Sequence, residues 1–360
     1  MYFVLYDKDL KTIGETYILE SWNRTQRAAD FDEINIVGEQ IPYSANPFLV
    51  VVNDKQGKQM FSGLASTPQI DEKAKKTTFS LKDYMTLFNS EIVVDWSKFS
   101  GTTLQDLFRF ILGLFREQIQ TGFQNIIYSV GRLEKISLDT EIKLNTETIE
   151  NVMVYDLISD AMNYYNAYCI PTLDLKTKTL TYTFYQAGVQ TTKIKLSDFG
   201  LTNVEKSFGD YNRATVYDKN FVKRKVWGLT EDNKIARYPN PSIPFVYPAK
   251  NRNFIAKETK ETITNDDGTT SELVSDGLNN AIYDAIMGLA GNRYQENIDL
   301  DAQRFKSIID LTSIDFAYDV EVYMPDGKYK TLPVGEIETD SKGKHIVKLG
   351  HRVQELTQII

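Results

Sequence analysis

The feature that most constrains this chain is a run of apolar residues at helical spacing between Thr102 and Gly122. Thr102 and Gln105 have the spacing of a capping box, in which each side chain can bond the other residue's backbone N–H. Gly122 stands where a left-handed helix stop is expected. Because such a stripe must be covered by another element, the helix predicts the start of a second domain. The stripe consists of Leu104, Leu107, Phe108, Ile111, Leu112, Phe115 and Ile119.

The first 90 residues have the pattern of short strands separated by polar turns. Phe48–Val52 and Met60–Leu64 flank a polar segment and predict a hairpin by strand composition and turn chemistry. A compact turn over 82–89 follows the predicted strand Thr77–Leu81. Five or six such strands favour a small antiparallel barrel over residues 1–90. The other predicted strands are Tyr2–Tyr6, Tyr17–Leu19, Ile34–Val37 and Thr77–Leu81.

Residues 91–198 predict an α+β domain. A second helix is expected from about Val152 to Tyr168, with apolar residues on one face. Two helices that cover one sheet form a common α+β layer. The predicted strands of this domain are Glu91–Trp96, Ile126–Tyr128, Ile142–Leu144, Thr172–Leu175, Leu180–Tyr185 and Thr191–Leu196.

The last part of the chain predicts a second barrel with a domain inserted in it. We assign residues 199–224 and 306–360 to the second barrel, and residues 225–305 to an inserted α+β domain. Ser275 can cap a third helix there. The fold class is therefore α+β and mostly β. The barrel strands include Val204–Phe208, Ala214–Tyr217, Val320–Met324, Tyr329–Val334, Ile337–Thr339 and His345–Leu349.

The composition weighs against several classes of function. A formal net charge of −8 disfavours tight nucleic-acid binding, which needs clustered positive charge. The single cysteine, Cys169, permits no intramolecular disulfide, and a buried apolar role is favoured for it. No apolar run approaches the ~18–20 residues that span a bilayer. The N-terminus lacks a secretory signal, so we expect no membrane segment and synthesis in the cytosol.

No catalytic, cofactor-binding or metal-binding residues are predicted. The only two histidines, His345 and His351, would lie roughly 20 Å apart along a strand and could not share a metal. No motif of a known hydrolase or nucleotide-binding loop is present. Two basic clusters are interpreted as solvated surface, and the turn over 265–268 is weak evidence for calcium. The clusters are Lys73, Lys75 and Lys76, and Lys223, Arg224 and Lys225.

The order of these parts resembles that of phage tail hub proteins. The segments that carry the resemblance are 79–88 with 91–94, then 281–289, 292–294 and 298–300, and finally 350–357. They are similar to baseplate proteins of siphophages and prophages of Gram-positive bacteria, the N-terminal structural part of the tail-associated lysin family. The contractile-phage baseplate hub is similar in the same way. The resemblance covers essentially the whole chain.

The resemblance implies a homotrimer in which two barrels per subunit alternate around a pseudo-sixfold ring. The ring would lie below a distal tail protein ring at the virion tail tip and would cap or continue the tail tube. Further implied partners are the tape measure protein and receptor-binding or fibre proteins, with DNA passing through the lumen without specific binding. Synthesis would take place in the bacterial host cytoplasm. Because the chain ends near the final strand, no lysin activity is expected, and the protein is predicted not to be an enzyme.

Two other functions remain open at this point. The first is a cell-wall (peptidoglycan) hydrolase of a phage tail, although paired carboxylates are always available among 49 acidic residues and their presence decides nothing. The second is a carbohydrate- or receptor-binding module, which would place Trp22, Trp96 or Trp227 in an exposed groove. We also hypothesise that the lumen of the ring is acidic, so that DNA passes with little friction.

Overall fold

The N-terminal strands close into an antiparallel barrel in the computed structural model. The structure describes residues 1–350 except 43, 119–124, 131–135, 139–148, 196–203, 208, 232–233, 265–269, 292–294, 302–310 and 325–326. The barrel order is β1-β4-β5-β7-β3-β2, and β2 pairs back onto β1. The predicted first barrel is thus confirmed. Its strands are β1 (Tyr2–Tyr6), β2 (Thr12–Arg27), β3 (Glu33–Glu39), β4 (Leu49–Asn53), β5 (Gln59–Ala65) and β7 (Lys76–Lys82), with β6 (Gln69–Asp71) on β7.

Alternating burial explains why these strands close around an apolar interior. In β1, Phe3 and Leu5 are fully buried, whereas their neighbours are partly exposed. The Phe3 ring stacks on Tyr17, with centroids 5.3 Å apart, and meets Phe79 edge-on at 5.9 Å. A period of two along every strand places one face of the sheet inside the barrel.

The α+β unit follows, and its first helix packs as the stripe predicts. The described stripe residues, from Leu104 to Phe115, are all buried, whereas Ile119 and Gly122 lie outside the described residues. The elements are η1 (Tyr84–Phe88), β8 (Glu91–Asp95), η2 (Trp96–Lys98), α1 (Leu104–Gln118), β9 (Asn125–Val130), β10 (Ile149–Met153), α2 (Val154–Tyr165), β11 (Ala167–Asp174) and β12 (Thr179–Gln186). One sheet has the order β11-β12-β9, and β8 pairs with β10. The predicted strand Ile142–Leu144 lies outside the described residues.

The first helix is capped one residue later than predicted. Thr103, not Thr102, accepts the backbone N–H of Asp106 at 3.2 Å, and the Asp106 carboxylate accepts the N–H of Thr103 at 3.1 Å. An isolated bridge to Ser137 keeps Thr103 extended, so the helix starts at Leu104. The second helix ends at Tyr165 because Asn166 is left-handed, and Tyr168 therefore belongs to β11.

Six further strands form a second β unit. They run in the order β14-β21-β24-β23-β22-β13. Two placements differ from the prediction. The strand at Thr191–Leu196 is β13, which pairs in parallel with β22 and not with the α+β sheet, and β21 comes from the segment assigned to the insertion. The strands are β13 (Gln190–Lys195), β14 (Val204–Ser207), β21 (Gln295–Asp301), β22 (Tyr318–Tyr323), β23 (Tyr329–Asp340) and β24 (His345–Leu349), with η4 (Leu311–Ser313).

The inserted unit is a small sheet covered on one face by a helix. The strand at Ala214–Tyr217, predicted for the second barrel, is β15 of this sheet and pairs with β16 and β18. Ser275 lies in β20, so Asp276 accepts the first free N–H of the third helix, that of Leu278, at 2.9 Å. The elements are β15 (Arg213–Tyr217), β16 (Lys223–Leu229), β17 (Ile235–Arg237), β18 (Asn251–Ile255), β19 (Thr259–Thr264), β20 (Thr270–Ser275) and α3 (Leu278–Gly291).

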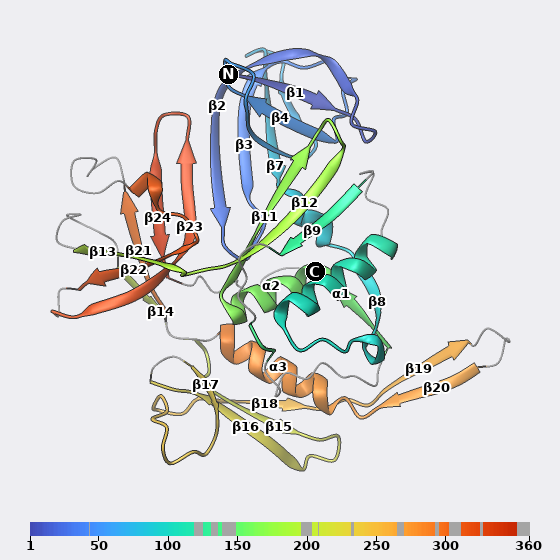
Figure 1. Ribbon diagram of the computed structural model, residues 1–360, viewed down its shortest axis with the longest axis vertical. Helices are drawn as coiled ribbons and strands as arrows, with labels where there is room; N and C mark the ends of the chain where they lie inside the picture. The colour runs from blue at the N-terminus through green and yellow to red at the C-terminus, as the bar shows by residue number, and fades with distance from the viewer. Residues whose placement is uncertain are drawn as a thin grey trace.

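The other three parts lie around the helices of the α+β unit (Figure 1). The first barrel is at one end of the long axis and the inserted unit at the other, while the second β unit lies beside the barrel. The two β units belong to one continuous sheet, because β2 pairs with β23. No helix in the described part of the chain is long and apolar enough to cross a bilayer. The division into four domains stays a prediction.

Candidate functional site

The most distinctive feature of the structure is the seam at which β2 pairs with β23. Asn23 to Arg27 lie opposite Asp340 to Glu336 in antiparallel register. The pairing continues at one end, where the backbone N–H of Ser341 donates to the carbonyl of Trp22 at 2.9 Å. These two strands are long enough to complete their own units and also to join each other. Because main-chain hydrogen bonds fix register, the seam holds the two units in one relative position.

Charged side chains at the seam are paired. Glu336 is only 4% exposed and accepts from Arg27 Nε at 3.3 Å and from Lys348 Nζ at 2.5 Å. Lys348 also pairs with Glu338, which accepts from Lys344 at 2.5 Å. Burial raises the pKa of Glu338, but the hydrogen bonds from Lys344 and Lys348 outweigh it and lower that pKa to about 2. This network therefore links a strand of the first barrel to two strands of the second unit.

A second set of polar contacts fixes the barrel against the α+β unit. Ser159 Oγ on α2 donates to the carbonyl of Ala29 at 2.7 Å, and Tyr155 donates to Asp30. Beneath them, Asp32 accepts from Arg24 at 2.6 Å. Burial raises the pKa of Asp32, and Arg24 opposes that effect. These carboxylates hold backbone and arginine groups in place, which is a structural role.

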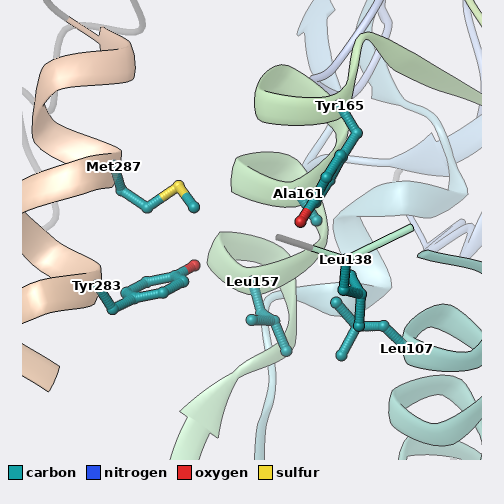
Figure 2. A pocket seen from close by; sticks show the side chains of 7 residues that line it. All are labelled: Leu107, Leu138, Leu157, Ala161, Tyr165, Tyr283 and Met287. Atoms are coloured by element: carbon teal, nitrogen blue, oxygen red, sulfur yellow. The ribbon is translucent and has the colours of Figure 1, made fainter. Parts of the chain in front are cut away.

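The junction of the three helices contains a small apolar pocket. Tyr283 and Met287 of α3 face Leu157, Ala161 and Tyr165 of α2 across it, with Leu107 and Leu138 at its side (Figure 2). Its free volume of about 20 Å³ is enough for roughly one water molecule. Ligand sites are usually ~300–1,000 Å³, so the pocket is a loosely packed contact between units.

One carboxylate at this junction is displaced from its ordinary titration range. Asp160 on α2 accepts a hydrogen bond from the hydroxyl of Tyr283 at 3.4 Å. Burial raises the pKa of Asp160 to about 6, repulsion from Asp156 and Asp284 adds to the shift, and the Tyr283 bond opposes it. The folded protein is therefore less stable with Asp160 charged than with Asp160 protonated.

The residues considered from sequence do not converge on a catalytic site. Cys169 is buried in β11, and His345 lies in β24, whereas His351 is outside the described residues. Trp96 and Trp227 are each 2% exposed, which argues against a binding groove at these two residues, and the half-buried Trp22 packs on Phe61. Across the residues that the structure describes, no three His, Cys, Asp or Glu side chains could hold a metal ion. The turn over 265–268 is not among them.

The two basic clusters are at the surface. Lys73 and Lys75 are exposed in the turn before β7, and Lys76 pairs with Glu20 at 2.6 Å. In the second cluster, Arg224 pairs with Asp218 and Lys225 lies over the ring of Trp227. The interpretation of both clusters as solvated surface fits these positions.

The seam was not predicted from sequence. Only Tyr17–Leu19 of β2 was expected, because the strand loses its alternation of apolar residues after Leu19. The available signal was the long polar continuation to Arg27 together with the acidic residues of the segment 336–340. Opposite charges at cross-strand positions stabilise a strand pair, but local patterns do not show which strands meet.

Comparisons with known proteins match solved structures only. No family model and no curated protein matches the chain. It is similar to the prophage tail protein gp18 from Listeria monocytogenes, with 11% identity, a TM-score of 0.49 and coverage of 98% of this chain and 95% of that one. The 43 kDa tail protein of prophage MuSo2 from Shewanella oneidensis gives 14% identity, a TM-score of 0.48 and 98% coverage of each chain. A chain of the phage P2 baseplate, in its activated conformation with calcium, gives 12% identity, a TM-score of 0.45 and coverage of 98% of this chain and 99% of that one. All three are tail or baseplate proteins of phages or prophages.

Proposed function

We propose that this protein is the structural hub of a phage tail tip or baseplate, and that it has no enzymatic activity of its own. The observation that carries the proposal is the β2–β23 seam, which joins a closed barrel and a second six-stranded β unit in one sheet. A rigid pair of similar-sized β units is a suitable repeating block for a ring. The sequence resemblance to tail hub proteins independently favours the same role.

The second β unit supports self-association. Among the described strand pairings, β13 and β14 stand at the ends of its strand order, with no described strand on their outer edges. An edge strand exposes unpaired N–H and C=O groups that natural proteins cover. Copies of the chain in a closed cyclic arrangement would cover them. We therefore propose a homotrimer with pseudo-sixfold alternation of the two β units.

The proposed ring has several partners. It would lie below a distal tail protein ring at the virion tail tip, in contact with the tape measure protein and with receptor-binding or fibre proteins. DNA would pass through its lumen during infection. An acidic lumen is part of this proposal, and a reconstruction of the assembled ring would overturn that part if the pore wall proved to be basic.

The mass of the purified chain in solution tests the proposal. Light scattering should give three times the chain mass, or a ring complex when a distal tail protein is added. A single-chain mass under both conditions would contradict the homotrimer. A zymogram with Gram-positive cell walls tests the hydrolase alternative, because a structural hub leaves no clearing whereas a peptidoglycan hydrolase does.

A further inference from the structure

The turn between β15 and β16 presents apolar side chains to solvent. We call residues Asp218–Val222 the hairpin tip. Within it, Phe221 is 69% exposed and Val222 is 49% exposed, and Ile255 of the adjoining strand β18 is 41% exposed. Tyr217 pairs with Ile255, so the three apolar residues lie at the same end of the sheet. The inserted unit that carries them is at the end of the molecule opposite the first barrel (Figure 1).

The hairpin tip is held in one shape. Oδ1 of Asp218 accepts the backbone N–H of Asn220 at 2.9 Å and of Val222 at 2.8 Å. Arg224 binds the other carboxylate oxygen, with Nε at 2.8 Å. Phe221 has φ of +61°, a left-handed conformation that bulky residues seldom adopt. The chain therefore fixes an exposed phenylalanine where asparagine or glycine would be less strained.

The hairpin tip lies in a basic part of an acidic chain. Residues 211–260 contain eleven Lys and Arg against four Asp and Glu, whereas the other residues contain thirty against forty-five. Lys223 directly follows the hairpin tip and Lys257 follows Ile255 by two positions, and both are exposed. Lys219 is exposed as well and pairs with Glu258. Exposed Lys223 and Lys257 thus lie close in sequence to the apolar residues, whereas the charge of Lys219 is balanced by Glu258.

Size and charge decide what could cover this surface. A stable protein interface buries roughly 800 Å² on each partner, far more than three exposed side chains provide. A bilayer needs no matching shape, accepts apolar side chains at its interface and attracts lysines when it contains anionic lipids. The arrangement of an apolar turn with neighbouring lysines therefore fits a membrane surface better than a protein partner.

We propose that the hairpin tip docks on an anionic phospholipid bilayer. Phe221 and Val222 would enter the interfacial layer, while Lys223 and Lys257 would contact the headgroups. This inference concerns a single chain and does not depend on the proposed hub function. Three tips on one homotrimer would bind more tightly than one, because the second and third contacts become intramolecular.

Vesicle flotation tests the proposal with the whole chain. The wild type should float with mixed phosphatidylcholine–phosphatidylglycerol vesicles, more weakly at high salt, and not with phosphatidylcholine alone. Phe221→Asn, which suits the left-handed turn, should weaken binding by about tenfold. Tyr247→Ser is the matched control, because Tyr247 is also 69% exposed but precedes β18, at the end of the sheet away from the hairpin tip. Equal loss in both variants, or no flotation of the wild type, would overturn the proposal.

A tryptophan reporter gives a second measurement. In Phe221→Trp the new indole should shift its emission to shorter wavelength on addition of the mixed vesicles. The wild type, treated in the same way, gives the background from Trp22, Trp96 and Trp227. An unshifted spectrum would contradict insertion. If the wild type self-associates without lipid, and Phe221→Asn abolishes that association, the hairpin tip is instead a contact between copies and the lipid proposal is wrong.

Discussion

The two β units of this chain manage their edges in different ways. In the first barrel β2 returns to pair with β1, so all six strands have neighbours on both sides. In the second unit the described strand order ends at β13 and β14. The first unit completes its hydrogen bonds alone, whereas the second relies on the β2–β23 seam and, in our proposal, on further copies. One β unit of the chain is therefore closed by its own strands, and in our proposal the other provides the edges for assembly.

The largest effect is expected in the core of the closed barrel. Phe79→Ala removes a fully buried ring that meets Phe3, and should lower the free energy of unfolding by about 4 kcal/mol. Val347→Ala, at a fully buried position of the second unit, is the matched variant and should cost about half as much. Urea denaturation measures both. A loss below about 1 kcal/mol for Phe79→Ala would contradict a well-packed barrel.

A smaller effect is expected at the seam between the units. Glu336→Ala leaves Arg27 and Lys348 without their shared buried partner, and should destabilise the protein by about 3 kcal/mol. The control is Glu20→Ala, which breaks a pair with Lys76 in which both side chains are 43% exposed, and should cost less than about 1 kcal/mol. Thermal or urea unfolding gives both values. If the two variants cost the same, the network does not hold the units together.

Gly38 and Gly335 lie where backbone or side-chain atoms of the same chain approach closely, one glycine in each β unit. In the barrel, a Cβ on Gly38 would lie 2.5 Å from the Phe3 ring, and in the second unit a Cβ on Gly335 would lie 2.3 Å from the Gly350 carbonyl. Each Gly→Ala change should therefore destabilise by roughly 1–3 kcal/mol. Gly113→Ala in α1 meets nothing within 4 Å and should stabilise by up to about 1 kcal/mol. Melting temperatures that rise for all three variants would show that these approaches are not tight.

The smallest effect concerns pH and the contact between α2 and α3. The pKa of Asp160 is raised from 3.8 to about 6, so the folded protein holds more protons than the unfolded chain between these values. Stability from this group is present at low pH and is lost as pH rises through about 6. Asp160→Asn should remove that dependence and stabilise the protein at pH 7 by roughly 1–2 kcal/mol. Urea unfolding at pH 5 and pH 7 measures it, and an unchanged pH dependence in the variant would refute the assignment.

Local sequence patterns predicted where the helices and strands lie better than they predicted which strands pair with each other. The α1 stripe and the hairpins of β4 with β5, and of β11 with β12, follow from periodicity and turn residues, which act within a few positions. Helix starts were misplaced by one residue at Thr103 and Asp276, because the choice between adjacent capping residues depends on the preceding strand or bridge.

Long-range pairing lay beyond the sequence patterns. β13 pairs with β22, more than a hundred residues further along the chain, and nothing in its alternation distinguishes that partner from the α+β sheet. The seam was missed for the same reason, since nothing near Arg27 or Glu336 in the sequence distinguishes them from ordinary surface charges until the strands are placed side by side. The pocket at the helix junction is lined by residues from separate segments of the chain, so no single motif predicts it.

In our proposal, the seam makes the two β units of each chain into one building block for a closed ring. Electron microscopy of the purified chain, with class averages viewed along the ring axis, tests it most directly. We expect rings of three chains with six β lobes around a central opening. Isolated single-chain particles, or rings in which the two β units of a chain separate at the seam, would contradict it.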